Sequence, residues 1–215
     1  MASVYVIGLT GGIGAGKSSV ASQFALKGAD IVDTDEISHR LTGRNGHAMA
    51  ALEAAFGNAV VADNGSLDRL AMRDLIFASP NAKAQLEAIL HPMIRAEAME
   101  ILAVAQKRNA HYAMLVVPLL FEHMGFRETC DRTLAVDCPE SMQVARVQRR
   151  SSLAPEMVTR IMATQIPRAI RLQLADDVIC NAFEPERIAA QVATLHAHYL
   201  ARARSADSCC LAQHL

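Results

Sequence analysis

A glycine-rich segment near the start of the chain, Gly11–Ser18, has the residue types needed to hold phosphate groups. It reads Gly-Gly-Ile-Gly-Ala-Gly-Lys-Ser and matches the pattern G-x-x-x-x-G-K-[ST] without a gap. Glycines let such a loop turn its backbone N–H groups inward around phosphate oxygens, and the N-terminus of a following helix adds positive charge. Lys17 would reach the terminal phosphates and the Ser18 hydroxyl would ligate Mg²⁺. This segment therefore predicts a nucleotide site, rather than a glycine turn without a ligand.

Two carboxylates follow the next apolar run, in Asp33-Thr34-Asp35. At the end of a parallel strand they would lie at the carboxyl edge of the sheet, beside the phosphate loop. One carboxylate would take a proton from an acceptor hydroxyl, and the other would hold metal-bound water. The alternative interpretation is a helix N-cap, which aspartate also favours.

Arginines are concentrated in a later stretch whose one acidic residue is Glu156: Arg146, Arg149, Arg150, Arg160, Arg168 and Arg171. The first three share a helical face by their spacing. Arginine supplies planar, permanently charged donors suited to phosphate, so we expect a mobile lid that closes over ATP and excludes water. A solvated helix face is the alternative.

Short apolar runs that alternate with helical patterns supply the elements that must position these residues. Strands are predicted at 4–10, 29–33, 112–118, 132–137 and 177–180. Helices are predicted at 17–27, 36–41, 47–56, 68–77, 81–106, 139–150, 155–163, 167–175 and 185–204. Ser79 should cap the helix at 81–106, and Pro92 should break or kink it. The alternation predicts an α/β fold, a parallel sheet with helices on both faces.

Composition limits the class of protein. The chain has 215 residues, of which 52% are hydrophobic and 20% charged, so a globular domain is expected and disorder is excluded. The net charge of -1 argues against a nucleic-acid polymer as partner. Five scattered cysteines indicate free thiols in a reducing compartment and no zinc site. The start does not resemble a signal peptide and no apolar run could span a membrane, so we expect a cytoplasmic protein without an obligate protein partner.

Taken together, the motifs of this chain resemble those of the dephospho-CoA kinase family. The resemblance spans residues 4 to about 200 and rests on motifs that follow one another in the family's order: Leu9–Ser18, Asp33-Thr34-Asp35, Leu90-His91-Pro92, Val117-Pro118-Leu119-Leu120 with Glu122, Arg146 with Arg149 and Arg150, Gln165, Arg168, Arg171 with Leu172, Ala175-Asp176-Asp177-Val178-Ile179 and Asn181. Many relatives have an acidic residue where this chain has Val117, and threonine where it has Ser19.

The resemblance implies a three-layer P-loop NTPase fold with strand order 2-3-1-4-5. It implies one domain over 1–204, with a helical CoA-binding insertion at about 36–110, a lid at about 139–170 and a loose tail at 205–215. The implied reaction, the final step of coenzyme A synthesis, transfers the γ-phosphoryl group of ATP to the ribose 3′-hydroxyl of dephospho-CoA, with Mg²⁺.

The resemblance also implies roles for single residues. Asp35 is the expected general base with Asp33 beside it, and Lys17 and the lid residue Arg146 serve the phosphates. The expected ATP contacts are Gly12, Ile13, Gly14, Ala15, Gly16, Lys17, Ser18, Ser19, Arg146, Arg149 and Asn181. The expected contacts to the acceptor are Thr10, Asp35, His91, Pro92, Leu119, Glu122 and Arg168. Ser18 and Asp33 are the expected metal ligands, with Asp35 as the alternative to Asp33 because Val117 is not acidic.

For some of these residues a purely structural interpretation stays open. His91 would be only a residue at a helix kink, and the Pro118–Leu120 segment would be only core packing. Among other functions, a shikimate-type kinase should carry a Gly-Gly-Gly acceptor loop, which the sequence lacks. An adenylate kinase should carry acceptor-side arginines, and a GTPase an Asn-Lys-x-Asp motif. A non-catalytic nucleotide-binding regulator would need neither the aspartate pair nor the arginine-rich lid.

Overall fold

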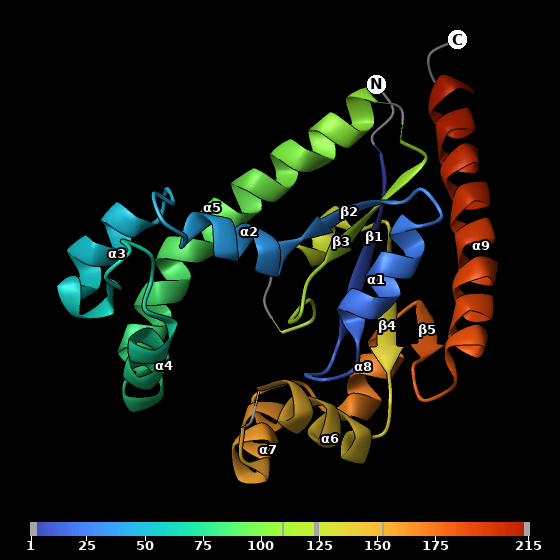
Figure 1. Ribbon diagram of the computed structural model, residues 1–215. Coiled ribbons are helices and arrows are strands. Elements are labelled where there is room, and N and C mark those ends of the chain that lie inside the picture. Colours follow the sequence, from blue (N-terminus) through green and yellow to red (C-terminus); the bar gives the residue numbers. More distant parts are fainter. Residues whose placement is uncertain (1–3, 109, 123–124, 152, 213–215) are drawn as a thin grey trace. The chain divides into compact units, whose positions relative to one another are not determined.

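A parallel sheet carries the glycine-rich loop. The computed structural model describes residues 4–108, 110–122, 125–151 and 153–212, and within them five strands pair in the order β2-β3-β1-β4-β5 (Figure 1). The central strand β1 is Tyr5–Gly11, and its neighbours are β3, Tyr112–Val116, and β4, Arg132–Asp137. The outer strands are β2, Asp30–Asp33, and β5, Asp177–Cys180. The predicted α/β fold and strand order are confirmed.

The apolar runs become central strands because both faces of the sheet are covered. Every residue of β1 after Tyr5 is buried, and all five residues of β3 are buried. In the parallel register Leu9 lies between Val116 of β3 and Leu134 of β4. A strand that is buried on both faces needs continuous apolar side chains rather than an alternating pattern.

Helices α1 and α9 pack against each other and share the main core (Figure 1). Helix α1 is Lys17–Ala25 and α9 is Pro185–Ala212. The rings of Phe24 and Tyr199 stack with centroids 6.0 Å apart, and Tyr112 meets Tyr199 edge-on at 5.7 Å. The Tyr199 hydroxyl donates to Asp177 at 3.0 Å, and Arg132 binds the same carboxylate with two hydrogen bonds. These contacts fix α9 on the sheet next to β5.

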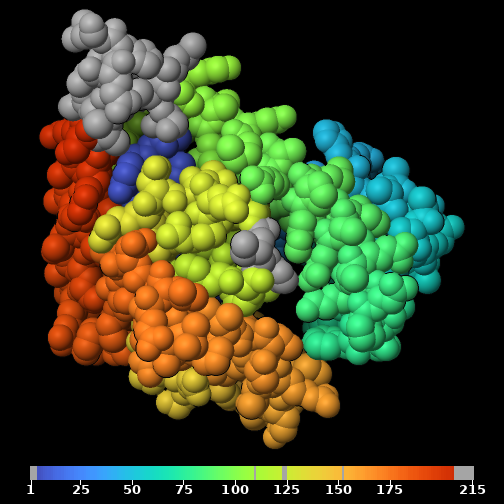
Figure 2. All heavy atoms as spheres, turned by 180° about the vertical axis from the view of Figure 1, so that it is seen from behind, coloured from blue at the N-terminus to red at the C-terminus, as the bar shows by residue number. Residues whose placement is uncertain are grey.

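Three helices connect β4 to β5 and occupy the stretch predicted as a lid. They are α6, Glu140–Ser151, α7, Pro155–Ala163, and α8, Arg168–Leu174. Helix α6 packs on α7, and α8 packs on β4. In Figure 2 the orange residues of this region form a continuous surface next to the red helix α9. A short 3-10 helix, η2, Arg127–Thr129, precedes β4.

The chain divides into two compact units. The first comprises the chain up to Val32 and from Leu102 onward, and the second is Asp33–Ile101. The second unit holds α2, Thr34–Leu41, α3, Met49–Phe56, the 3-10 helix η1, Asn58–Val60, α4, Arg69–Ala78, and most of α5, Pro80–Lys107. Arg40 of α2 donates two hydrogen bonds to Glu97 of α5, at 2.9 and 2.6 Å. That this unit is the acceptor-binding insertion stays a prediction.

Helix α5 is not interrupted where a break was expected. Helix α5 continues from Pro80 through Pro92 to Lys107, so the predicted break is wrong, while a kink stays a prediction. A proline inside a helix costs about 3 kcal/mol, and buried positions along this long helix, such as Leu90 and Ala98, offset that cost by packing. The start of α5 is as predicted, since Ala82 N–H donates to Ser79 Oγ at 3.2 Å.

Helix α9 is also longer than predicted. It continues past residue 204 to Ala212, so the tail expected to be loose is helical that far, and residues 213–215 lie outside the described ranges. No glycine or proline occurs in 205–212 to end the helix. Of the helices in the described ranges, none is long and apolar enough to cross a membrane.

The packing of α1 on α9 yields a first prediction. Phe24 is fully buried, so Phe24→Ala should lower the free energy of unfolding by about 3–5 kcal/mol through lost contact and a residual cavity. Leu26 lies just beyond α1 and is 88% exposed, so Leu26→Ala should change the free energy of unfolding by less than about 0.5 kcal/mol. Urea denaturation of the full chain measures both, and equal losses would contradict the assigned core.

Candidate functional site

The loop between β1 and α1 has a backbone that favours glycine. Gly14 and Gly16 have φ angles of +72° and +92°, a region that L side chains rarely adopt. A Cβ on Gly16 would also collide with the side-chain amide of Asn181, which lies against the loop. Helix α1 begins directly after Gly16, at Lys17. The predicted strand–loop–helix context of the phosphate-binding pattern is therefore present.

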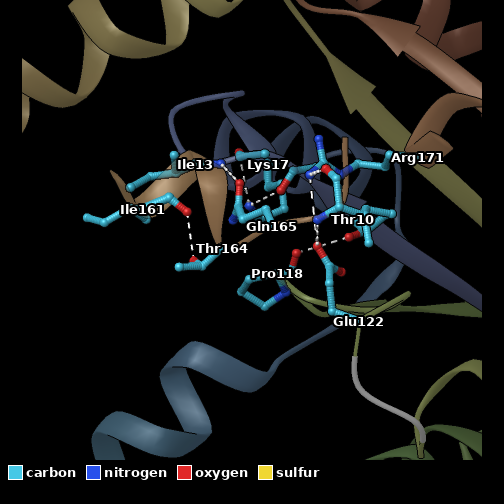
Figure 3. Close-up of polar contacts among 12 residues, drawn as sticks. Thr10, Ile13, Lys17, Pro118, Glu122, Ile161, Thr164, Gln165 and Arg171 are labelled. Atoms are coloured by element: carbon cyan, nitrogen blue, oxygen red, sulfur yellow. Dashed lines mark hydrogen bonds and ion pairs between the residues drawn. The ribbon is translucent and has the colours of Figure 1, made fainter. Parts of the chain in front are cut away.

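The Lys17 ammonium folds back over the loop. Its Nζ donates to the carbonyl of Gly11 at 2.8 Å and to that of Gly12 at 3.4 Å (Figure 3). The positive charge is therefore held at the loop, where the N-terminus of α1 adds its own partial charge. Ser18 and Ser19 are exposed in the first turn of the helix. This end of the loop is suited to a phosphate group.

Two predicted ATP contacts, Arg146 and Asn181, brace the loop at Ala15. Asn181 Nδ2 donates to the Ala15 carbonyl at 2.7 Å. Arg146 donates to that carbonyl at 3.3 Å and to the Asn181 carbonyl at 2.9 Å. The structure thus brings α6 and the end of β5 to the phosphate loop. Arg149 instead lies on an exposed face of α6, where its Nε donates to the carbonyl of Ala145.

The connection between α7 and α8 also reaches the loop. Gln165 Oε1 accepts a hydrogen bond from Ile13 N–H at 3.0 Å (Figure 3). The next residue, Ile166, donates its N–H to Glu122 Oε1 and accepts from Arg171 Nη2, each at 3.0 Å. Glu122 was predicted to touch the acceptor, and here it binds the backbone between α7 and α8. Gln165 is a contact that the sequence analysis noted without a role.

Glu122 and Arg171 form a buried ion pair. Their closest charged atoms are 3.9 Å apart, and the side chains are only 10% and 8% exposed. Burial lowers the pKa of Arg171, while the charge of Glu122 acts in the opposite direction. The Arg171 guanidinium also lies close to the phosphate loop, since a Cβ added to Gly12 would be 3.2 Å from Arg171 Nη1. The pair therefore connects the segment after β3, helix α8 and the phosphate loop.

Arg168, predicted to contact the acceptor, is paired with Asp137 at the end of β4. Two parallel hydrogen bonds of 2.6 Å join the guanidinium to the carboxylate. They raise the pKa of Arg168, which favours its charged form. Asp137 was not predicted as a site residue, although a carboxylate that ends a buried strand is a usable signal.

The other predicted acceptor contacts of the first unit lie along the segment after β3. The Thr10 hydroxyl, at the end of β1, donates to the carbonyl of Pro118 at 3.2 Å. Leu119 is half-buried and Leu120 is buried, so this segment also contributes core packing. Val117, where an acidic residue was expected, is buried as well.

The remaining predicted residues belong to the second unit. The Asp33 carboxylate caps α2, accepting from Asp35 N–H at 2.8 Å and from Glu36 N–H at 3.4 Å, which confirms the N-cap interpretation for Asp33. Asp35 is exposed in the first turn of α2, and His91 and Pro92 are exposed on α5. Their roles toward nucleotide and acceptor stay predictions.

The oxygen donors fit a metal that keeps most of its own water. Within the part of the chain that the structure describes, no three His, Cys, Asp or Glu side chains gather as a metal site. Mg²⁺ needs only one or two protein oxygens and takes its other ligands from water and phosphate. The exposed Ser18 hydroxyl can supply one such oxygen.

Known proteins are similar to this chain in sequence. A family model described as dephospho-CoA kinase matches residues 5–186. The dephospho-CoA kinase of Chromobacterium violaceum is 50% identical over 93% of this chain and 96% of its own. That of Aromatoleum aromaticum is 49% identical over 94% of this chain and 97% of its own.

Solved structures extend the comparison. A crystal structure of a Thermus thermophilus protein superposes with a TM-score of 0.77 at 32% identity, covering 91% of this chain and 98% of that one. The dephospho-CoA kinase from Campylobacter jejuni superposes with a TM-score of 0.64 at 23% identity, covering 88% and 94%. The second likeness supports the fold.

The loop geometry gives a second prediction. Gly16→Ala combines a disfavoured φ with a collision against Asn181, so affinity for ATP should fall at least about tenfold as the loop shifts. Gly28 has the same φ of +92° but nothing within 4 Å of an added Cβ. Gly28→Ala should lower stability by about 1 kcal/mol and leave ATP affinity unchanged. Calorimetric titration with ATP and urea denaturation separate the two, and unchanged ATP binding by Gly16→Ala would contradict the assignment.

Proposed function

The chain belongs to the dephospho-CoA kinase family, and from this premise we propose how its residues divide the transfer of the γ-phosphoryl group of ATP to the ribose 3′-hydroxyl of dephospho-CoA. The observation that carries the proposal is the glycine loop with Lys17 folded over it, in a chain that matches the family over residues 5–186. ATP is the phosphoryl donor that this loop accommodates.

Positive charge at the loop would stabilise the phosphoryl group during transfer. Lys17 and the N-terminus of α1 face the developing charge on the phosphate oxygens. Arg146 already contacts Ala15 and so supports this charge from the lid. Because these donors are held by hydrogen bonds within the protein, little reorganisation is needed at the moment of transfer.

Asp35 is the proposed general base. It would take the proton of the ribose 3′-hydroxyl while the oxygen attacks the γ-phosphorus and ADP leaves. The support is its place in the Asp33-Thr34-Asp35 motif and its exposure at the start of α2. Asp33 fixes that turn through its cap hydrogen bonds.

Ser18, with Asp33 or Asp35, is the proposed Mg²⁺ site. The bound metal would neutralise charge on the β- and γ-phosphates. The exposed hydroxyl at the first turn of α1 supports this assignment.

The proposed acceptor contacts are Thr10, Asp35, His91, Pro92, Leu119, Glu122 and Arg168. Two of them hold other partners: Glu122 accepts from Ile166, and Arg168 binds Asp137. To contact dephospho-CoA as well, Arg168 would have to use N–H donors that do not bind Asp137. Glu122 would have to use lone pairs that do not accept from Ile166. Cys130, Cys138 and Cys180 are free thiols, which supports a reducing, cytoplasmic compartment.

The acceptor is the third prediction. The protein with Mg²⁺ and ATP should release ADP at a high rate with dephospho-CoA and only at background with shikimate or AMP. A coupled ADP assay measures this, with a reaction lacking acceptor as the control. ADP release that dephospho-CoA does not stimulate would contradict the proposal, and stimulation by shikimate or AMP instead would favour another small-molecule kinase.

The general base is the fourth prediction. Asp35→Asn removes the proton acceptor but keeps the shape of the side chain, so kcat should fall by about 10²–10⁴-fold while ATP affinity stays within about twofold. Glu36→Gln removes one charge from the same helical turn and serves as the matched control, with kcat nearly unchanged. If ATP affinity fell as much as kcat in Asp35→Asn, the residue would be a metal ligand or structural residue instead.

A further inference from the structure

The Gln165 amide lies directly on the phosphate loop. Its Oε1 accepts from Ile13 N–H at 3.0 Å, and Ile13 lies between the two glycines Gly12 and Gly14 (Figure 3). That bond fixes which way the amide faces, because its oxygen serves the loop. A glutamine amide also carries two N–H donors on Nε2. Those donors are therefore held at the edge of a loop built to receive a polyanion.

The lid backbone that carries Gln165 is held by the buried pair described above. Glu122 and Arg171 both bind the backbone of Ile166: Glu122 accepts from its N–H, and Arg171 donates to its carbonyl. In the described part of the chain, Glu122 Oε2 and Arg171 Nε are buried without a hydrogen-bond partner. Burying unpaired charged groups is unfavourable, which points to a role other than stability for this pair.

We propose that Gln165 contacts the ATP phosphates, with its oxygen on Ile13 N–H and its Nε2 donating to a phosphate oxygen, and that Glu122 and Arg171 are the positioning residues that hold it there. This inference rests on the proposed function, because it places ATP in the glycine loop. The contact links the lid to the loop through a neutral donor, beside the charged donors Lys17 and Arg146. It gives Glu122 a role on the ATP side of the reaction.

Gln165→Glu tests the donor directly. A carboxylate keeps the acceptor for Ile13 N–H but has no donor and adds negative charge, so the dissociation constant for ATP should rise by at least about tenfold. Gln165→Ala loses the donor without adding charge and should raise the dissociation constant for ATP by about threefold to tenfold. Gln173→Glu, the control, places the same charge on an exposed position of α8. It should change the dissociation constant for ATP by less than about twofold.

Adenosine, which has no phosphate, separates a phosphate contact from a general disturbance of the site. Its affinity, measured by NMR titration, should stay within twofold in all three variants, while calorimetry reports the losses for ATP. Equal losses for adenosine and ATP would overturn the proposal, and so would Gln165→Glu binding ATP as tightly as Gln173→Glu. If the unmodified protein bound no ATP, the proposed function itself would be wrong; normal ATP binding with an unaffected Gln165→Glu overturns this inference alone.

A double-mutant cycle tests the positioning pair. Glu122→Ala should weaken ATP binding about as much as Gln165→Ala, and the combined variant should be no weaker than either, because the pair acts through Gln165. Glu122→Gln keeps an oxygen for Ile166 N–H and should restore affinity, and Glu128→Ala, at an exposed site, is the control. Should Glu122→Ala unfold, Arg171→Lys takes its place in the cycle. Losses that add fully in the combined variant would overturn the positioning role.

Discussion

Donors that are already fixed bind a polyanion with less loss of free energy than donors that must first be ordered, and the arrangement around the glycine loop follows from that constraint. The loop starts from β1, whose buried side chains hold it between two neighbouring strands. Its carbonyls hold the Lys17 ammonium, and Asn181 and Arg146 grip the Ala15 carbonyl. The apolar core therefore serves the site by making the backbone of this one turn rigid.

Polar side chains carry that rigidity to segments far away in the sequence. The Arg168–Asp137 pair ties α8 to the end of β4, and the Glu122–Arg171 pair ties the segment after β3 to the lid connection. Ion pairs contribute little net stability, whether part-exposed as at Arg168 or buried as at Glu122 and Arg171, but each joins two segments that are distant in the sequence. Helix α8 is thus held by charged contacts at Arg168 and Arg171, while α6 packs on α7.

Much of this fold could be predicted from the sequence, because buried parallel strands are continuous apolar runs and the loop motif has a fixed spacing. The bounds of β4 and β5 agree with prediction, whereas Pro92 did not end α5 and α9 extends to Ala212. The pairings of Gln165 with Ile13 and of Arg168 with Asp137 could not be predicted, since they join residues 152 and 31 positions apart through tertiary packing. The family resemblance indicated Glu122 as a site residue, but its bond to the Ile166 N–H is visible only in the structure.

The contact between Asn181 and the glycine loop has an evolutionary consequence. The Asn181 amide fills the space beside Gly16, and it also bonds Ala15, 166 positions earlier in the chain. A larger residue at position 16 would collide with Asn181, and a larger residue at position 181 would collide with Gly16. These two distant parts of the chain are therefore not free to vary independently. Relatives should therefore change residues 15–16 and residue 181 together or not at all. Recombination that joined the first half of one such protein to the second half of a distant one would separate matched partners, even though each half kept its own motifs.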